Sequence, residues 1–474
     1  MRILKTLSLA FGLNLLDYAL GPVTTVIVAK CLSVGDFGFY SWMATLSGFI
    51  LSFCSLGLGV YNYKTIPGRP IDEQYFILGR SLFIELICSL VGILVVAFWI
   101  RDDLLKYGVL FLFVSRVMIG VVNAESLRFL GYQKRQNTKT LIGFVDSKLW
   151  AIPLLVFFFL KTVSILTIVL SLLIGNTVTL VLLLISINSK ALLGAIRFDS
   201  KFARTALAIS LPLLLIDVGL YFQEMLGRYL LKGFTSYESL GLFSFTYGWF
   251  AVIFKFGILG VYIIQPHFSE GYFLWKSGKI EALDKVNSQL SVSFKYSIFL
   301  IVGAVLWFIM EYQELILLVG KKQYSETFLC ACYLSIYPLA IFVAYFNQIL
   351  LVLQGKTARM PLFYLVALIV NVLVTLLLIR SIGYAAAGIA SSVSYVLLAI
   401  IMAAQNMRSE FKFLPDIIGW LKFLASIAVF ILCTYLLKRV VDIFAVRAAC
   451  MLLVGLVACI INYDKKDIGV LRTI

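Results

Sequence analysis

Long apolar runs alternate with short polar loops along the whole chain. Each run holds about 20 mostly apolar residues, the length that a helix needs to cross a bilayer. The pattern predicts an all-α polytopic membrane protein with about fourteen transmembrane helices. The predicted spans are 7–29, 38–60, 76–99, 107–124, 141–160, 163–187, 205–230, 240–266, 290–310, 326–353, 361–380, 383–404, 416–437 and 443–462.

The composition agrees with this interpretation. The chain has 474 residues, 62% of them hydrophobic, and a mean hydropathy of +1.00. A soluble protein cannot bury so much apolar surface. The net charge of +16 would suit a nucleic-acid-binding protein, but the basic residues lie mostly in the loops between spans. We therefore expect the lipid bilayer as a partner and no nucleic acid.

Lys and Arg are distributed unevenly between the two sides of the predicted membrane domain. With the N-terminus in the cytoplasm, the loops on that side hold 22 of the 40 Lys and Arg residues, and the opposite loops hold 10. Loops rich in Lys and Arg tend to stay in the cytoplasm. The bias predicts a multi-pass protein with both termini in the cytoplasm.

The predicted span 205–230 carries a polar stripe. At about 100° per residue, Glu224 and Arg228 each fall within roughly 20° of Asp217 around the helix. Charged groups in a membrane helix face a bundle interior or a watery cavity rather than lipid. One interpretation is an ion-coupling site at Asp217 and Glu224, with Arg228 in an ion-pair network. The other is a structural Glu224–Arg228 pair beside a hydrogen-bonded Asp217.

The first predicted span also has a polar face near a helix breaker. Asn14, Asp17, Tyr18 and Gly21 are spaced to share one face, and Pro22 follows directly. Proline removes one backbone hydrogen bond and favours a kink. Broken or kinked spans often mark transport sites. Asp17 is therefore a candidate ion-coupling residue, although a packing kink beside a hydrogen-bonded Asp17 is the alternative.

Eight basic residues lie within predicted spans or at their edges, and four of them are candidates for lining a substrate cavity. Arg116 is the strongest signal, because neither end of its span is close. Arg80 either extends toward the nearby membrane surface or points into a cavity. Lys255 and Lys295 lie in spans of the second half of the chain. Cations in a low-dielectric path would suit an anionic substrate such as a pyrophosphate.

The sequence offers no metal site and no catalytic constellation. Most of the eight cysteines lie within spans and none has metal-ligand spacing, and His267 is the single histidine. Gly355-Lys356-Thr357 resembles the end of a phosphate-binding loop, but the first glycine of that motif would fall at Leu350. We therefore expect no cofactor, no metal and no enzymatic activity.

The second half of the chain echoes the first in four places and in the same order. GFYS (38–41) resembles GLFS (241–244), LGVY (58–61) recurs at 259–262, SLRFLGYQK (126–134) resembles ILLVLQGK (349–356), and NTVTLVLL (176–183) resembles SSVSYVLL (391–398). The echoes predict a duplicated six-span unit. We expect an N-terminal lobe at 1–189, a basic cytoplasmic linker at 190–204, a pseudo-symmetric second lobe at 205–404, and two extra helices at 405–474.

Two stretches resemble a known family. The stretch LSVGDFGFYSWMATLSGFILSFCSLGLGVY (32–61) resembles the N-terminal region of oligosaccharide flippases, of the O-antigen repeat-unit type, and residues 320–398 resemble their tenth to twelfth spans. These flippases belong to the multidrug/oligosaccharidyl-lipid/polysaccharide exporter superfamily. The resemblance implies two six-helix lobes, alternating access and a bacterial inner-membrane location.

The resemblance also implies the cargo and the cavity. The expected substrate is an undecaprenyl-pyrophosphate-linked oligosaccharide, carried from the cytoplasmic to the periplasmic leaflet with H⁺ or Na⁺ as coupling ion. Polysaccharide assembly proteins, such as a polymerase and a chain-length regulator, are expected partners. Family members often carry cationic cavities, and the candidates here are Arg80, Arg116, Lys255 and Lys295.

Two alternatives are open. A cation-coupled multidrug or solute antiporter of the same superfamily would use Asp17 and Asp217 similarly, but its cavity should be acidic or apolar. A membrane glycosyltransferase or O-antigen polymerase would need a sizeable extramembrane loop, and the longest loop, at about 267–289, is too short to hold a catalytic domain. The basic residues within spans favour the flippase.

Overall fold

The computed structural model describes residues 2–133, 135–279, 281–407, 410–411, 417–440 and 446–447, and this part of the chain is made of helices, with no β-strand. The chain divides into two compact units, Met1–Gly241 and Leu242–Ile474. The first unit includes the helix from Ser200 to Phe234, which the repeat pattern assigns to the second lobe. The lobe boundaries drawn from the repeat stay a prediction.

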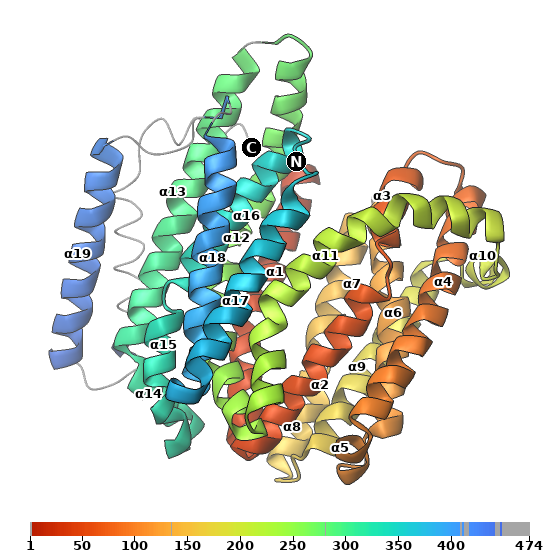
Figure 1. Ribbon diagram of the computed structural model, residues 1–474. Helices are drawn as coiled ribbons and strands as arrows, with labels where there is room; N and C mark the ends of the chain where they lie inside the picture. Colours follow the sequence, from red (N-terminus) through yellow and green to blue (C-terminus); the bar gives the residue numbers. More distant parts are fainter. Residues whose placement is uncertain are drawn as a thin grey trace. The chain divides into compact units, whose positions relative to one another are not determined.

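The first unit contains eleven described helices, coloured red to green in Figure 1. They are α1 (Arg2–Cys31), α2 (Val34–Phe53), α3 (Leu58–Thr65), α4 (Ile71–Trp99), α5 (Arg101–Lys106), α6 (Leu110–Tyr132), α7 (Gln136–Lys148), α8 (Ala151–Phe159), α9 (Ile165–Ser186), α10 (Ser189–Ala195) and α11 (Ser200–Phe234).

These helices pack into one bundle. α6 packs against α4, α7 and α9, α1 packs against α7, and α11 lies along α2 and α3. Apolar side chains fill the space where α3, α4 and α6 meet, among them Leu58, Leu78 and Phe129, all fully buried. This apolar cluster fixes α3 and the C-terminal end of α6, which carry the polar groups described below.

Local sequence signals set the helix ends. The Ser33 hydroxyl accepts from the amide of Asp36 and caps α2, and Ser164 forms a capping box with Thr167 at the start of α9. Gly57, between α2 and α3, has a φ of +69°, a conformation that residues with a side chain rarely adopt. The chain can therefore turn sharply there.

A close helix crossing joins the start of α2 to the residues around Gly241. A Cβ atom on Gly38 would lie 1.8 Å from the carbonyl oxygen of Tyr237, and one on Gly241 would lie 2.2 Å from the carbonyl oxygen of Val34. Only glycine permits such an approach of two backbones. Gly38 and Gly241 are also the first residues of the first sequence echo, GFYS and GLFS.

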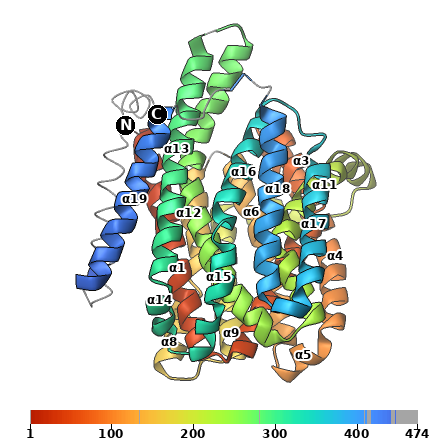
Figure 2. The same ribbon diagram turned by 60° about the vertical axis from the view of Figure 1, so that its left-hand side comes forward.

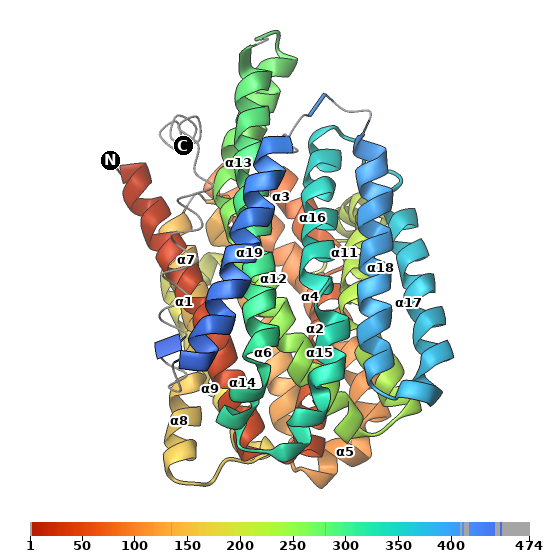
Figure 3. The same cartoon turned by 90° about the vertical axis from the view of Figure 1, so that its left-hand side faces the viewer.

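The second unit contains the remaining described helices, which Figure 2 shows most openly. They are α12 (Tyr237–Lys276), which begins in the first unit, α13 (Glu281–Met310), α14 (Tyr312–Val319), a 3₁₀ turn (Lys322–Thr327), α15 (Phe328–Leu334), α16 (Tyr337–Leu353), α17 (Met360–Ile382), α18 (Ala385–Asn406) and α19 (Ile417–Val440). α18 packs against α15, α16 and α17, and α19 packs against α13, as Figure 3 shows.

The expected all-α polytopic membrane fold is confirmed. Ten described helices are long and apolar enough to cross a membrane, and a bent pair, Lys322–Leu334 with Tyr337–Leu353, makes an eleventh if it forms one span. α2 and α11 occupy two more predicted span positions. The fourteenth predicted span, 443–462, lies almost wholly outside the described residues.

Candidate functional site

An ion pair joins α1 to α7 in the first unit. The Nζ of Lys148 lies 3.2 Å from Oδ1 of Asp17, and the hydroxyl of Ser147 donates to the same oxygen at 2.5 Å. The side chains of Lys148 and Asp17 are 15% and 26% exposed. Sequence reasoning expected an ion pair at Asp217 rather than at Asp17. The structure places a cation beside Asp17, and the side chain of Asp217 lies outside the described residues.

Pro22 lies inside α1, one turn beyond Asp17. Proline leaves the helix one backbone donor short at this point. The hydroxyls of Thr24 and Thr25 donate to the carbonyl oxygen of Gly21 at 2.8 and 3.0 Å. α1 nevertheless continues as one helix to Cys31.

Arg116 lies in the first third of α6, because this helix continues beyond the predicted span end to Tyr132. Its Nη1 is 3.5 Å from the hydroxyl of Ser47 on α2, and its buried Nε has no hydrogen-bond partner among the described residues. The carboxylate of Asp146 on α7 is near enough to act on the guanidinium charge. Within the described part of the chain, no carboxylate lies within 4 Å of Arg116, so its charge is incompletely paired.

Amide side chains connect the helices around Arg116. Nδ2 of Asn123 on α6 donates to Oδ1 of Asp146 at 3.2 Å and to the carbonyl oxygen of Asn176 on α9 at 2.9 Å. Nδ2 of Asn176 donates to the carbonyl oxygen of Arg116 at 3.4 Å. The polar groups of α6, α7 and α9 therefore hold the backbone near Arg116 in place.

Arg80 is buried on α4 and bonds to the link before α11. Its Nη1 donates to the carbonyl oxygen of Arg197 at 2.9 Å, its Nε lies 3.9 Å from Oδ2 of Asp199, and its guanidinium lies 4.6 Å from the centre of the Phe76 ring. The amide of Phe202, and then the Arg80 charge, hold the pKa of Asp199 below its ordinary value. Arg80 and Arg116 share none of these partners.

Lys255 and Lys295 lie in the second unit. Lys255 on α12 is exposed. Lys295 on α13 is half-buried, and its Nζ lies 5.3 Å from the centre of the neighbouring Tyr296 ring. Neither position by itself assigns a lysine to a substrate path, so the role of both residues stays a prediction.

The polar stripe of α11 faces α2 at Tyr221. The Tyr221 hydroxyl donates to the carbonyl oxygen of Thr45, and the Tyr221 ring lies against Gly48. Glu224 and Arg228 are half-buried, and Nη1 of Arg228 lies 2.7 Å from Sδ of Met225. The choice between an ion-coupling site and a structural pair at Glu224 and Arg228 stays a prediction.

A charged cluster that sequence reasoning missed lies at the C-terminal end of α6. Oε2 of Glu125 accepts from Nη1 of Arg128 at 2.9 Å, and Oε1 accepts from Nδ2 of Asn62 at 2.6 Å. The Ser81 hydroxyl donates to Oδ1 of Asn62 at 2.9 Å. Glu125 is 0% exposed, and Glu85, 2% exposed, is near enough for the two carboxyl groups to influence each other.

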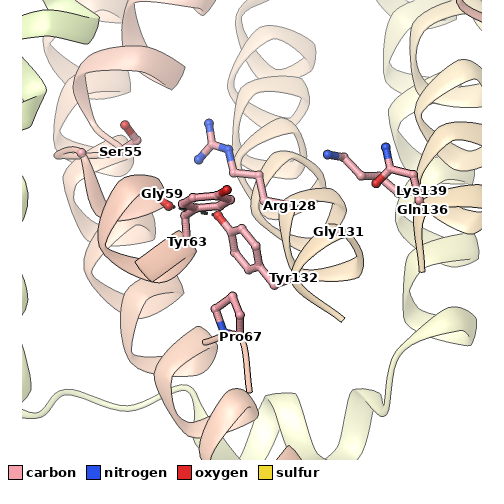
Figure 4. Close-up of a pocket in the computed structure, with 10 residues that line it drawn as sticks. Ser55, Gly59, Tyr63, Pro67, Arg128, Gly131, Tyr132, Gln136 and Lys139 are labelled. Atoms are coloured by element: carbon pink, nitrogen blue, oxygen red, sulfur yellow. Dashed lines mark hydrogen bonds between the residues drawn. The ribbon is translucent and has the colours of Figure 1, made fainter. Parts of the chain in front are cut away.

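Beside this cluster is a cavity of about 620 Å³. Figure 4 shows the residues that line it, with Arg128 and Tyr132 on α6, Tyr63 on α3 and Lys139 on α7. The Tyr132 hydroxyl donates to the carbonyl oxygen of Gly59 at 3.0 Å. The lining combines two cations with two aromatic rings, which is a chemistry suited to an anionic group on an organic carrier.

Comparison with solved structures identifies the fold. A lipid II flippase, MurJ, in an inward closed conformation superimposes with a TM-score of 0.71 at 12% identity, covering 95% of this chain and 97% of that chain. A multidrug resistance MATE family transporter of the MOP superfamily, in an inward-facing conformation, gives 0.63 at 14% identity, covering 85% and 99%. The MATE multidrug transporter DinF-BH gives 0.60 at 14% identity, covering 88% and 97%.

The chain has the MATE- and MurJ-like transporter fold. No protein-family model matches the sequence. No curated protein matches it either. The chain therefore shares its fold with solved multidrug transporters and a lipid II flippase.

The charged cluster of Glu125 and Arg128 could have been predicted from the spacing of these two residues in the sequence. Glu125 and Arg128 are spaced i, i+3, which places both on one helix face. The predicted fourth span ends at residue 124, and the basic stretch after it is typical of a loop. α6 continues to Tyr132, so Glu125 lies inside the bundle and Arg128 lies at its edge.

Proposed function

We propose that this protein is a flippase of the bacterial inner membrane. It moves an undecaprenyl-pyrophosphate-linked oligosaccharide, such as an O-antigen repeat unit, from the cytoplasmic to the periplasmic leaflet by alternating access. Arg116 carries the proposal. It is a guanidinium within a membrane helix, and among the described residues its Nε has no hydrogen-bond partner and no carboxylate lies within 4 Å of it.

The chemistry of such a group favours an anionic substrate. A charge in the bilayer interior costs about 2.5–3.5 kcal/mol on insertion scales, so an incompletely paired arginine needs a functional reason. A guanidinium binds phosphate oxygens through two parallel hydrogen bonds. The pyrophosphate of the lipid-linked substrate would supply the charge that Arg116 lacks, and the likeness to a lipid II flippase supports this substrate class.

Coupling to a H⁺ or Na⁺ gradient is proposed for the carboxylates of the polar helices. Asp17 is described, is held by Lys148 and Ser147, and lies one turn before Pro22 in α1. An ion that binds Asp17 in competition with Lys148 would break the link between α1 and α7. Such binding would shift the equilibrium between two conformations, provided they differ in affinity for the ion. Asp217 and Glu224 are the other proposed coupling residues.

The test is a deletion strain complemented with variants. We expect the strain to lose surface glycan and to accumulate the lipid-linked intermediate, and the wild-type gene to restore both. Arg116→Ala should restore neither at normal protein level, and Arg116→Lys should restore part, because lysine keeps the charge without the two-pronged donor. Wild-type glycan in well-expressed Arg116→Ala cells would remove Arg116 from the substrate path.

A cation-coupled multidrug antiporter is the second candidate, favoured by the similarity to MATE transporters. The same deletion strain separates the two. An antiporter predicts increased sensitivity to cationic drugs and unchanged surface glycan, and a flippase predicts the reverse. Cysteine labelling should also place residue 200 on the cytoplasmic side, and labelling from the periplasm in intact cells would overturn the proposed topology.

A further inference from the structure

The cavity at the ends of α3, α6 and α7 brings two cations together, and among the described residues Glu125 is the one carboxylate within 4 Å of either. Arg128 uses Nη1 to bind Glu125, yet its side chain is 43% exposed. Lys139 is half-buried, and no carboxylate lies within 4 Å of it in the part of the chain that the structure describes. The positive charge of Arg128 acts on Lys139. Two like charges held at one cavity are stabilised when an anion binds between them.

The acidic groups of this region lie behind the cavity rather than in it. Of the ten residues that line it, two are basic and none is acidic. Glu125 is fully buried and shares its charge between Arg128 and Asn62. It therefore fixes the direction of the guanidinium while leaving the remaining N–H donors of Arg128 to face a ligand, so the donors are positioned before binding.

Glycines keep the space between the cations open. A Cβ atom on Gly59 would lie 2.9 Å from Nη1 of Arg128, and one on Gly131 would lie 3.2 Å from Nζ of Lys139. In Figure 4 Arg128 and Lys139 reach into the cavity from neighbouring helices, and Gly131 lies on the same helix as Arg128. A side chain at either glycine would displace one of the two cations.

Aromatic rings provide the rest of the wall. The rings of Tyr63 and Tyr132 lie 6.2 Å apart at 63° to each other, and Tyr132 is held by its bond to Gly59. Tyrosine faces pack against sugars, bases and alkyl chains, whereas arginine and lysine bind phosphate oxygens. The cavity thus has one side for an anion and another for the group that carries it.

We propose that this cavity is a binding site for a phosphoryl group, with Arg128 and Lys139 as its ligands. The group is a phosphate or diphosphate and belongs either to a lipid headgroup or to a soluble phosphate compound. The site is separate from Arg116, whose hydrogen-bond partner Ser47 is not among the partners of Arg128. The proposal does not depend on the flippase hypothesis, because binding is measured without transport.

The test uses the purified full-length protein. Titration calorimetry would measure binding of inorganic pyrophosphate to protein in detergent. A second arm would measure binding to nanodiscs that contain undecaprenyl phosphate against nanodiscs of phosphatidylcholine alone. Lys139→Gln removes a cation without leaving a described carboxylate unpaired, so it should fold normally. We expect it to weaken binding about tenfold, the effect of losing one charged contact of about 1.4 kcal/mol.

Matched variants make the result specific. Lys190→Gln, an exposed lysine of the same unit, should bind as the wild type does. Gly59→Val should weaken binding by displacing Arg128. Binding in the pyrophosphate arm identifies a soluble ligand, and binding in the nanodisc arm alone identifies a lipid headgroup. Absence of saturable binding in both arms, or equal affinities for Lys139→Gln and wild type, would overturn the proposal.

Discussion

The first unit and helices α16 to α18 of the second unit hold their polar side chains together with different chemistry. In the first unit, buried Glu125 bonds both Arg128 and Asn62, and Asp17 bonds Lys148. In the second unit, Nδ2 of Asn406 donates to the side-chain and backbone oxygens of Asn347 at 3.0 and 2.9 Å. Neutral pairs recur along α16, α17 and α18: Gln354 with Asn406, Tyr364 with Gln348, and Asn371 with Ser394.

This difference indicates which polar groups hold the helices together and which serve transport. Amide and hydroxyl bonds between membrane helices each contribute about 0.6–2 kcal/mol and satisfy both partners. Charges cost more to bury and are usually retained for a function. The described ion pairs of the second unit involve Arg447 with Glu311 and Glu314, where α13 meets α14. The helices α16 to α18 are therefore a neutral frame, whereas the described ion pairs lie in the first unit and, in the second unit, at Arg447.

The largest effect on stability is expected at Glu125. Glu125→Ala leaves the Arg128 guanidinium without its anion and Asn62 without its acceptor. Breaking one side of a buried pair costs about 3–5 kcal/mol. Since Arg128 is partly exposed, the loss should fall at the lower end of that range. Thermal unfolding of the purified protein should show a clearly lowered Tm.

Glu125→Gln is the matched control. Glutamine keeps an acceptor for Asn62 and fills the same volume, so it should lose less than Glu125→Ala. An unchanged Tm in both variants would mean that the Glu125 cluster does not stabilise the first unit. The proposed contrast between charged pairs in the first unit and neutral pairs on α16 to α18 would then be wrong.

A smaller effect is expected in the neutral frame. Asn406→Leu removes the bonds to Asn347 and Gln354 and should destabilise the protein by about 1–2 kcal/mol. Transport per molecule should stay close to wild type, because no charged group is involved. If Asn406→Leu is stable but inactive, the amides of α16 to α18 take part in transport and the proposed division is wrong.

The helices were predictable because each membrane span appears in the sequence as a run of about 20 mostly apolar residues. Thirteen predicted spans coincide with helices of the structure. Helix ends were harder to predict: α6 runs on to Tyr132 because Glu125 and Arg128 neutralise each other within the helix. Polarity alone made this last turn look like a loop.

The candidate site was predictable only where a residue is unusual by itself. Arg116 was found because a guanidinium in mid-span is conspicuous. The partner of Asp17 was not found, since Lys148 is more than a hundred residues away and only the packing of α1 on α7 brings them together. The cavity was missed for the same reason, because its walls come from α3, α6 and α7.

The smallest effect on stability, with a large effect on transport, is expected at Asp17. The Asp17–Lys148 pair is partly exposed, so its loss in Asp17→Asn should cost about 1 kcal/mol or less. Asparagine still accepts from Ser147 but cannot hold a proton or Na⁺ as a carboxylate does. We expect vesicles with Asp17→Asn to lose the stimulation of flipping by an imposed pH or Na⁺ gradient.

Lys148→Met separates coupling from packing at the same site. It breaks the ion pair but keeps the carboxylate, so gradient-dependent flipping should persist with a changed pH or Na⁺ dependence. Asp217→Asn, measured in the same flipping assay, tests whether the polar stripe of α11 takes part in ion coupling. If Asp17→Asn and Asp217→Asn both flip substrate with full gradient dependence, these carboxylates are structural. The charges of the first unit would then serve stability as the amides of the second do, and the coupling site would lie elsewhere in the chain.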